Sequence, residues 1–453
     1  MVNRKRLFTT TLSIASVLTL AACGGSGDAA TDSGGASADG TKTLTFMFRG
    51  GEDEQKAYES AIEAYETDHP GVDVEIIATD PDQYDTKLQA SIAGNDIPDV
   101  FYIAQGDVMA YVDNGILMDI TEEVENSDFD IDNVWEYGVD SYRYDGKNVG
   151  EGNIYGLPKD VGPFALGYNK TMFEEMGIPL PDVDVPYTWD QFVEVGKQLT
   201  ADTDGDGEVD QWANGFNVAW SLQAFVWSNG ADFLNEDKTK VTVDTPEFAE
   251  ALQYFADLQN VHQLTPSIAQ AQTLDTYQRW MNGEIGFFPV GPWDMSTYAG
   301  LDFEYDLIPW PAGSTGESAS FVGSLGIAVA DSTDYKEEAI ELAMYLSTSE
   351  EGQQQLVDAQ IQIPNLIDMA NEWAADTETV PSNKKEFLDV VSNYGRSMPA
   401  ASTYTAEWYD EFFINIQPVL DGDQTAADYL KSVQPRMQEL LDASIMQHEQ
   451  AAN

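Results

Sequence analysis

The stretch YGLPKDVGPFALGYNKTMFEEMGI, residues 155–178, separates two regions in which apolar strands alternate with amphipathic helices. Before it, TLTFMF (43–48), VDVEIIA (72–78) and IPDVFYIA (97–104) have the composition of buried strands. EDEQKAYESAIEAYETDHPG and YDTKLQASIAGN lie between them and have helical apolar spacing. This alternation predicts a parallel α/β sheet that binds ligands at loops beyond the carboxyl ends of its strands.

The helix predicted after the first strand has one apolar face, and further helices follow residue 178. The face consists of Ala57, Tyr58, Ala61, Ile62 and Tyr65, and His69-Pro70-Gly71 ends the helix. The later helices are predicted at TWDQFVEVGKQLTA, PEFAEALQYFADLQNV, YKEEAIELAMYLSTSEEGQQQLV and TAADYLKSVQPRMQELLDASIMQHEQ. The second part of the chain is therefore a second α/β region.

The chain is strongly acidic, with 21 Lys and Arg against 79 Asp and Glu and a formal net charge of -58. Its 453 residues correspond to roughly two or three domains. Phosphate backbones and anionic membrane surfaces repel such a chain, so we expect no nucleic-acid partner. A hydrated acidic surface explains the charge of an exported protein without naming a ligand.

The N-terminal residues carry the pattern of an export signal. Arg4, Lys5 and Arg6 precede LFTTTLSIASVLTL (7–20), which is too short for a comfortable membrane span. LAAC follows and ends at Cys23, the single cysteine. This resembles a bacterial lipoprotein signal, which implies removal of residues 1–22 and lipid on Cys23 at the extracellular face of the cell membrane. The alternative is a plain secretory signal with a chance cysteine. Residues 23–42 form a predicted flexible tether.

The stretch DTDGDGEVD (202–210) has the spacing of a calcium loop. Asp202, Asp204, Asp206 and Asp210 fall at EF-hand positions 1, 3, 5 and 9, and Glu208 offers its carbonyl at position 7. Position 12 is Ala213, so the bidentate glutamate is absent. The sequence favours a structural calcium ion over a hydrated turn, and a catalytic role ranks below both because nothing separates the carboxyl pKa values.

Several stretches in chain order resemble a known family. They are IPDVFYIAQGDVMAYVDNGILMDIT, the dividing stretch itself, MNGEIGFFPVGPWDMSTY, FVGSLGIAVA and VLDGDQTAADYLKSVQPRM. Together with the lipoprotein signal they resemble the extracellular solute-binding proteins of ABC importers, in the sugar-binding family that includes maltodextrin-binding proteins. The resemblance implies the periplasmic-binding-protein type II fold, with two α/β lobes, a hinge and an interlobe cleft. The implied lobes are 43–162 with 329–374 and 163–328 with 375–453.

The resemblance also implies a ligand site, because a sugar needs aromatic plates for its C–H face and polar groups for its hydroxyls. The implied residues are Glu52, Asp53, Gln105, Asp107, Asp160, Trp220, Trp293, Gly323, Ser324, Tyr404 and Trp408. Trp293 follows Gly-Pro in a turn, which favours exposure. Trp408 lies in a helical stretch and is equally compatible with a core position. Gln105 and Asp107 could instead cap the helix that follows them.

Three functions are compatible with these features. The leading interpretation is a monomeric, non-enzymatic receptor that hands an oligosaccharide to an ABC permease. A receptor for another solute, such as a polyamine, is the second. A lipid-anchored glycoside hydrolase is the third, since it also needs aromatic plates and paired carboxylates. HExxH, Walker A and GxSxG motifs are absent from the sequence.

Overall fold

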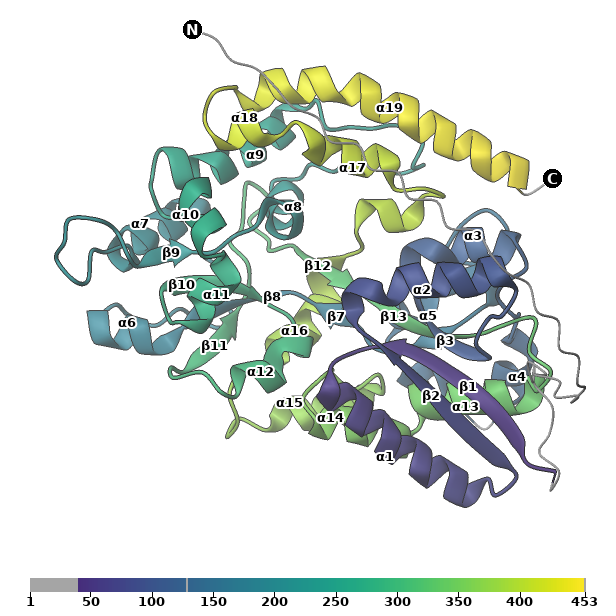
Figure 1. Cartoon of the computed structure of the whole chain (residues 1–453). Coiled ribbons are helices and arrows are strands. Elements are labelled where there is room, and N and C mark those ends of the chain that lie inside the picture. The colour runs from purple at the N-terminus through teal and green to yellow at the C-terminus, as the bar shows by residue number, and fades with distance from the viewer. Residues whose placement is uncertain (1–39, 128, 452–453) are drawn as a thin grey trace, which may run out of the picture. The chain divides into compact units, whose positions relative to one another are not determined.

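The computed structural model describes residues 40–127 and 129–451, and two main sheets organise this part of the chain. The first sheet has the strand order β2-β1-β3-β13-β6 (Figure 1). Its strands are β1 (Lys42–Arg49), β2 (Val72–Thr79), β3 (Val100–Ala104), β6 (Leu157–Pro158) and β13 (Leu325–Val329). β1 is parallel to β2 and β3, as predicted, whereas β13 runs antiparallel to β3 and β6.

The second sheet has the order β11-β8-β10-β9 and is mixed rather than parallel. Its strands are β8 (Ala165–Asn169), β9 (Trp212–Asn214), β10 (Ile285–Val290) and β11 (Tyr305–Ile308). A small third sheet joins β7 (Gly162–Pro163), β12 (Ser320–Gly323) and β14 (Gly395–Arg396). Because β6 and β7 pair with β13 and β12, residues 157–163 lie beside residues 322–327. The dividing stretch is therefore one of two adjacent chain crossings between the main sheets.

The helices of the first sheet form where apolar spacing predicts them. They are α1 (Glu52–Asp68), α2 (Pro81–Gly94), α13 (Lys336–Thr348) and α14 (Glu350–Asp358). α1 buries all five residues of its predicted apolar face and has acidic residues in its first turn, near the positive end of the helix dipole. The single helix predicted over 335–357 is wrong. Ser349 has an extended backbone, and its hydroxyl accepts a hydrogen bond from the Gly352 N–H, so α14 starts as a new helix.

The helices of the second region include α7 (Trp189–Leu199), α8 (Val218–Ser228), α9 (Pro246–Asn260), α17 (Glu407–Ile414) and α19 (Ala426–Ala451). Thr188 and Gln191 form a capping box at the start of α7. α19 runs alongside α17 in Figure 1 and continues through Pro435. The helices predicted at 188–201, 246–261 and 425–450 are thereby confirmed.

Separate hydrophobic clusters lie under the two sheets. One contains β1, β3, β13 and α1, and the other contains β8, α8, α9, α17 and α19. The lobe boundary expected between residues 328 and 329 falls inside β13, whose first residue, Leu325, already pairs with Ala104 of β3. The rest of the expected lobe division stays a prediction. Among residues 40–127 and 129–451, no helix is long and apolar enough to cross a membrane.

Candidate functional site

A cavity of about 710 Å³ lies where the chain crossings meet the carboxyl ends of β1 and β3. The loops after these two strands both contribute to its wall, as predicted for an open α/β sheet. Its lining includes Arg49, Gly50, Gly51, Glu54, Gln105, Gly106, Lys159, Asp160, Gly162, Phe164, Trp220, Trp293, Phe321, Gly323, Ser324 and Leu325. The volume is within the usual range for small-molecule sites.

Aromatic side chains form one wall of this cavity. The Phe164 ring makes edge-to-face contacts with Trp293, at 5.2 Å between centroids, and with Trp220, at 6.1 Å. Phe321 lies 5.7 Å from Phe164 and 5.9 Å from Trp220. Trp220 and Trp293 are 49% and 41% exposed, so their faces are open to a ligand. Accessible aromatic surface of this kind marks a binding site.

Local backbone geometry explains why Trp293 is exposed. The residue lies in the 3-10 turn η3 (Pro292–Asp294), which begins after Gly291 at the end of β10. A Cβ on Gly162 would lie 2.9 Å from the Trp293 ring, and a Cβ on Gly291 would lie closer still. Both glycines therefore let the indole of Trp293 approach the backbone closely where it lines the cavity.

Charged side chains form another part of the cavity lining. Lys159 is 3% exposed, and its Nζ lies 3.2 Å from Glu54 Oε1 and 3.1 Å from Asp160 Oδ2. The Tyr102 hydroxyl donates to the same Glu54 oxygen at 2.9 Å. Burial alone would lower the pKa of Lys159, but the carboxylates of Asp160 and Glu54 outweigh it, and the pKa is raised. Lys159 therefore stays protonated at neutral pH.

Asp160 also ties the cavity to the chain crossings. Its Oδ1 accepts the Leu325 N–H at 3.1 Å, and its carbonyl oxygen accepts the Ser324 hydroxyl at 2.5 Å. The Tyr142 hydroxyl donates to Ser324 Oγ at 3.0 Å. Asp160, Gly323 and Ser324 therefore line the cavity together, where the two chain crossings run side by side and are joined by hydrogen bonds.

Gln105 lines the cavity, and its side-chain amide makes hydrogen bonds to other residues of the chain. Its Nε2 donates to the Tyr137 hydroxyl at 2.8 Å and also to Ser141. The Tyr137 hydroxyl donates to the carbonyl oxygen of Val322 at 2.7 Å. Gln105 is thus fixed between β3 and β12, and its capping alternative is not observed in the 3-10 turn η1 (Gln105–Asp107).

Five of the predicted ligand residues do not line the cavity, and these predictions are corrected. Trp408 is fully buried and donates its indole N–H to Thr403 Oγ1. Tyr404 stacks on His448 at 5.0 Å. Glu52 and Asp53 face solvent, with Lys56 Nζ at 2.8 and 3.8 Å from their carboxylates.

Asp107, the fifth, neither lines the cavity nor caps α3 (Val108–Asp113). Burial raises the pKa of its carboxyl to about 6. Of the two loop residues predicted from their position at the strand end, Gln105 therefore lines the cavity and Asp107 does not.

Sequence reasoning missed Arg49, Glu54, Lys159, Phe164 and Phe321. Glu54 lies one residue beyond Asp53, in the same first turn of α1, and Lys159 precedes Asp160 in LPKD. Of the three acidic residues in this turn, only Glu54 lines the cavity, because the helix directs Glu52 and Asp53 to solvent. Phe164 lies two residues after Gly162, and Phe321 lies two residues before Gly323, a pattern that core residues also show.

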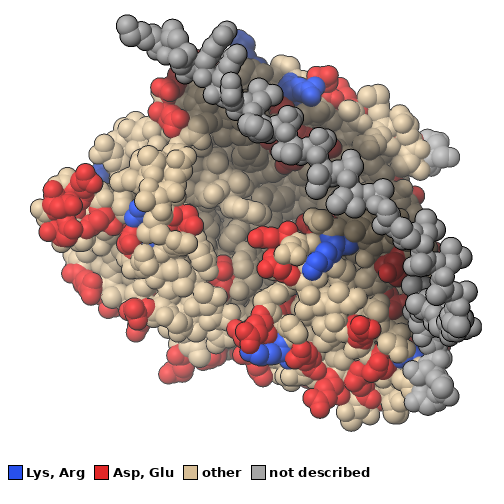
Figure 2. Space-filling model, in the orientation of Figure 1, with Lys and Arg blue, Asp and Glu red and all other residues tan. Residues whose placement is uncertain are grey.

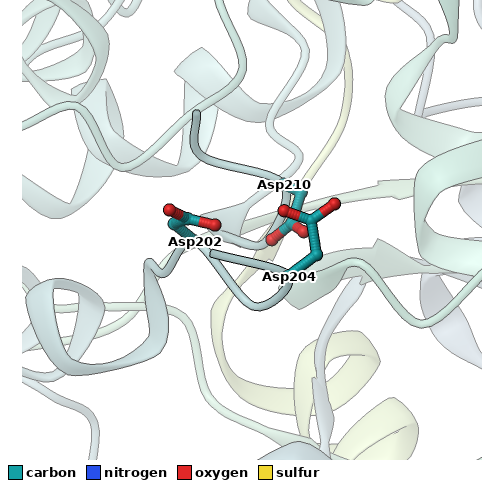
Figure 3. Close-up of side chains that lie close together, drawn as sticks. All are labelled: Asp202, Asp204 and Asp210. Carbon is teal, nitrogen blue, oxygen red and sulfur yellow. The ribbon is translucent and has the colours of Figure 1, made fainter. Parts of the chain in front are cut away.

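The acidic loop at 202–210 brings three carboxylates together (Figure 3). Oxygen atoms of Asp202, Asp204 and Asp210 lie within 4.8 Å of one another. The carboxylate of Asp206 is not part of this group, so the prediction for its side chain is corrected, while the backbone carbonyl expected of Glu208 stays a prediction. Asp202 accepts the N–H groups of Gly205 and Gly207 at 2.7 and 2.8 Å.

The donor set partly fits calcium. Three clustered carboxylates suit a hard cation, but they also accept hydrogen bonds within the loop, as Asp210 does from the N–H of Thr203 at 2.8 Å. This hydrogen bond lowers the pKa of Asp210. Calcium binding stays a prediction. The expected signal, tether and lipidated Cys23 lie essentially outside the described residues, which begin at residue 40.

Comparisons with known proteins identify the family. The model of the bacterial extracellular solute-binding protein family matches residues 50–353. The arabinooligosaccharide-binding protein of Halalkalibacterium halodurans is 32% identical over 216 residues, which are 46% of this chain and 46% of that protein. The chain thus matches about half the length of that relative. The lactose-binding protein of Rhizobium radiobacter is 24% identical over 298 residues, 62% of this chain and 64% of that protein.

Solved structures show the same fold. An ABC substrate-binding protein from Listeria monocytogenes, in complex with cycloalternan, superposes with a TM-score of 0.76 at 24% identity, over 88% of this chain and 99% of that one. The sugar-binding protein MalE from Xanthomonas citri gives 0.73 at 19% identity, over 90% and 100%. The predicted type II fold is confirmed, and the family is one of binding proteins rather than enzymes. The chain belongs to the family of bacterial extracellular solute-binding proteins.

Proposed function

We propose that this protein is an extracellular receptor that binds an oligosaccharide in the 710 Å³ cavity and delivers it to an ABC importer. The observation that carries the proposal is that exposed Trp220 and Trp293 line the same cavity as the hydrogen-bonding groups around Asp160. The aromatic faces suit the C–H face of a sugar ring, and the fixed polar groups suit its hydroxyls. The names of the arabinooligosaccharide- and lactose-binding relatives support the same ligand class.

The proposal extends to the location and partners of the protein. A lipid on Cys23 would hold the receptor at the outer face of the cell membrane, and permease subunits would receive the sugar from a monomeric receptor. The acidic surface spread over the face in Figure 2 suits an exported protein that stays dispersed. A calcium ion at Asp202, Asp204 and Asp210 would stabilise the second region without touching the ligand.

Intrinsic tryptophan fluorescence tests the ligand class directly. Residues 40–453 are titrated with arabinooligosaccharides, maltotriose and lactose, and Trp220→Ala and Trp293→Ala serve as site variants. We expect a saturable shift with one sugar class, which each variant weakens. Reducing ends are measured after long incubation, and their steady release would establish a hydrolase instead. A folded wild-type chain that responds to no sugar would refute the proposal.

Lipid attachment needs a separate test in cells. Wild-type protein and Cys23→Ser are expressed with a radiolabelled fatty acid, and membrane and soluble fractions are compared. We expect label and membrane retention for the wild type alone. Equal labelling of both proteins would refute the anchor and leave the ligand proposal unaffected.

A further inference from the structure

The charges of the cavity differ from those of the chain. The chain has 79 acidic and 21 basic residues, yet the cavity is lined by two of each: Glu54 and Asp160 with Arg49 and Lys159. The formal charges of the lining therefore cancel. A cavity that resembled the rest of the surface would be strongly acidic and would attract cations.

Lys159 is the central member of this balanced set. Its Nζ contacts one oxygen of Glu54 and one of Asp160, at 3.2 and 3.1 Å, and lies 5.9 Å above the Tyr102 ring. Lys159 is 3% exposed, so little of its charge reaches a ligand directly. Its ammonium and the guanidinium of Arg49 instead cancel the two carboxylate charges that would otherwise attract a cationic solute.

The contact with Lys159 also fixes the orientation of the Glu54 carboxylate. Glu54 Oε1 is occupied by Lys159 and by the Tyr102 hydroxyl, while no hydrogen bond to its Oε2 is present among the described residues. A Cβ on Gly50 would lie 2.7 Å from Glu54 Cδ, so the glycine makes room for this carboxylate at the cavity wall. Glu54 is thus held with one oxygen left to accept a hydrogen bond.

We propose that Lys159 makes the cavity selective for uncharged ligands, because together with Arg49 it balances the charges of Glu54 and Asp160, and because its contacts hold both carboxylates as hydrogen-bond acceptors. The inference rests on the proposed function and narrows it to neutral sugars over polyamines and aminosugars. Hydroxyl groups donate to a neutralised carboxylate, whereas an ammonium group gains too little from it to offset its own dehydration.

The test compares a neutral and a cationic probe by calorimetry. The probes are arabinooligosaccharides and spermidine, and the variants are Lys159→Met and the double variant Lys159→Met with Glu54→Gln. We expect Lys159→Met to bind the sugar at least about tenfold more weakly and spermidine at least about tenfold more tightly than the wild type. The double variant restores the charge balance and should again reject spermidine.

Lys384→Met is the matched control. Lys384 is also a buried lysine beside a carboxylate, with Nζ 3.1 Å from Asp376 Oδ2 and 5.7 Å above the Trp373 ring, but it does not line this cavity. Its loss should leave the affinities for both probes unchanged. If circular dichroism shows that Lys159→Met does not fold, Lys159→Gln replaces it, because the amide still donates to a carboxylate.

The outcomes separate this inference from the proposed function. A wild-type chain that binds spermidine, or a folded Lys159 variant with no gain of spermidine binding, would overturn the inference. A wild-type chain that binds neither probe contradicts the receptor for neutral sugars, while the spermidine gain in the Lys159 variant still decides the role of the lysine.

Discussion

Gly291 offers a way to displace Trp293 without disturbing the fold. The backbone of Gly291 has φ −102° and ψ 154°, which alanine adopts without strain. An alanine Cβ would nevertheless lie 2.6 Å from Trp293 Cη2 and closer to other ring atoms, where ordinary contact begins at 3.4 Å. The indole must therefore move by roughly 1 Å or tilt away from its position beside Phe164.

The size of the effect follows from the role of Trp293 as an aromatic plate. Loss of a well-packed aromatic contact in a binding site costs about 2 kcal/mol or more, so the affinity for an oligosaccharide should fall roughly 30-fold. The unfolding free energy of Gly291→Ala should stay within about 1 kcal/mol of the wild type, because alanine restricts the unfolded chain and offsets part of the ring displacement.

Calorimetric titration with arabinooligosaccharides, paired with thermal unfolding, measures both quantities. Gly71→Ala is the control, since a Cβ there meets nothing within 4 Å. Trp293→Ala gives the full loss for comparison. If Gly291→Ala binds the sugar as tightly as the wild type does, the argument that the position of the Trp293 ring determines binding is refuted.

Three further predictions concern the rest of the molecule. Trp408→Ala should lower the unfolding free energy by about 3–5 kcal/mol in denaturant titration, whereas exposed Trp220→Ala should change it by less than about 1 kcal/mol; equal losses would contradict the core assignment. Burial raises the pKa of Glu386 from 4.5 to about 8, so the native chain takes up this proton before the unfolded chain does. The contribution of Glu386 should thus increase stability as pH falls from about 8 to 5, by on the order of a few kcal/mol, and Glu386→Gln should remove this dependence. Calcium in excess of its dissociation constant should raise Tm by a few degrees, and Asp202→Asn or a chelator should abolish the shift; no shift at millimolar calcium would leave the loop a hydrated turn.

Several features of the fold followed from local sequence alone. The apolar face of α1 and the strands at 43–48, 72–78 and 97–104 were predicted because a period of 3.6 residues or a short β-branched run is a local property. The third of these strands, β3, begins only at Val100. Trp293 was expected to be exposed because Gly-Pro makes a turn at the end of a strand. The break at Ser349 was missed, because the apolar pattern continues through it while the capping hydroxyl ends the first helix.

The composition of the site was decided by tertiary structure. Glu52, Asp53 and Glu54 are equivalent acids in one helix turn, and only the packing of α1 against the sheet turns Glu54 toward Lys159 and leaves the other two in solvent. Trp220 and Trp408 both lie on helices, yet α8 presents Trp220 to the cavity and α17 buries Trp408 against its neighbours. Sequence by itself determined which residue types and turns were available. Tertiary structure decided which side chains meet, because contacts between residues more than 100 positions apart depend on how the sheets and crossings pack.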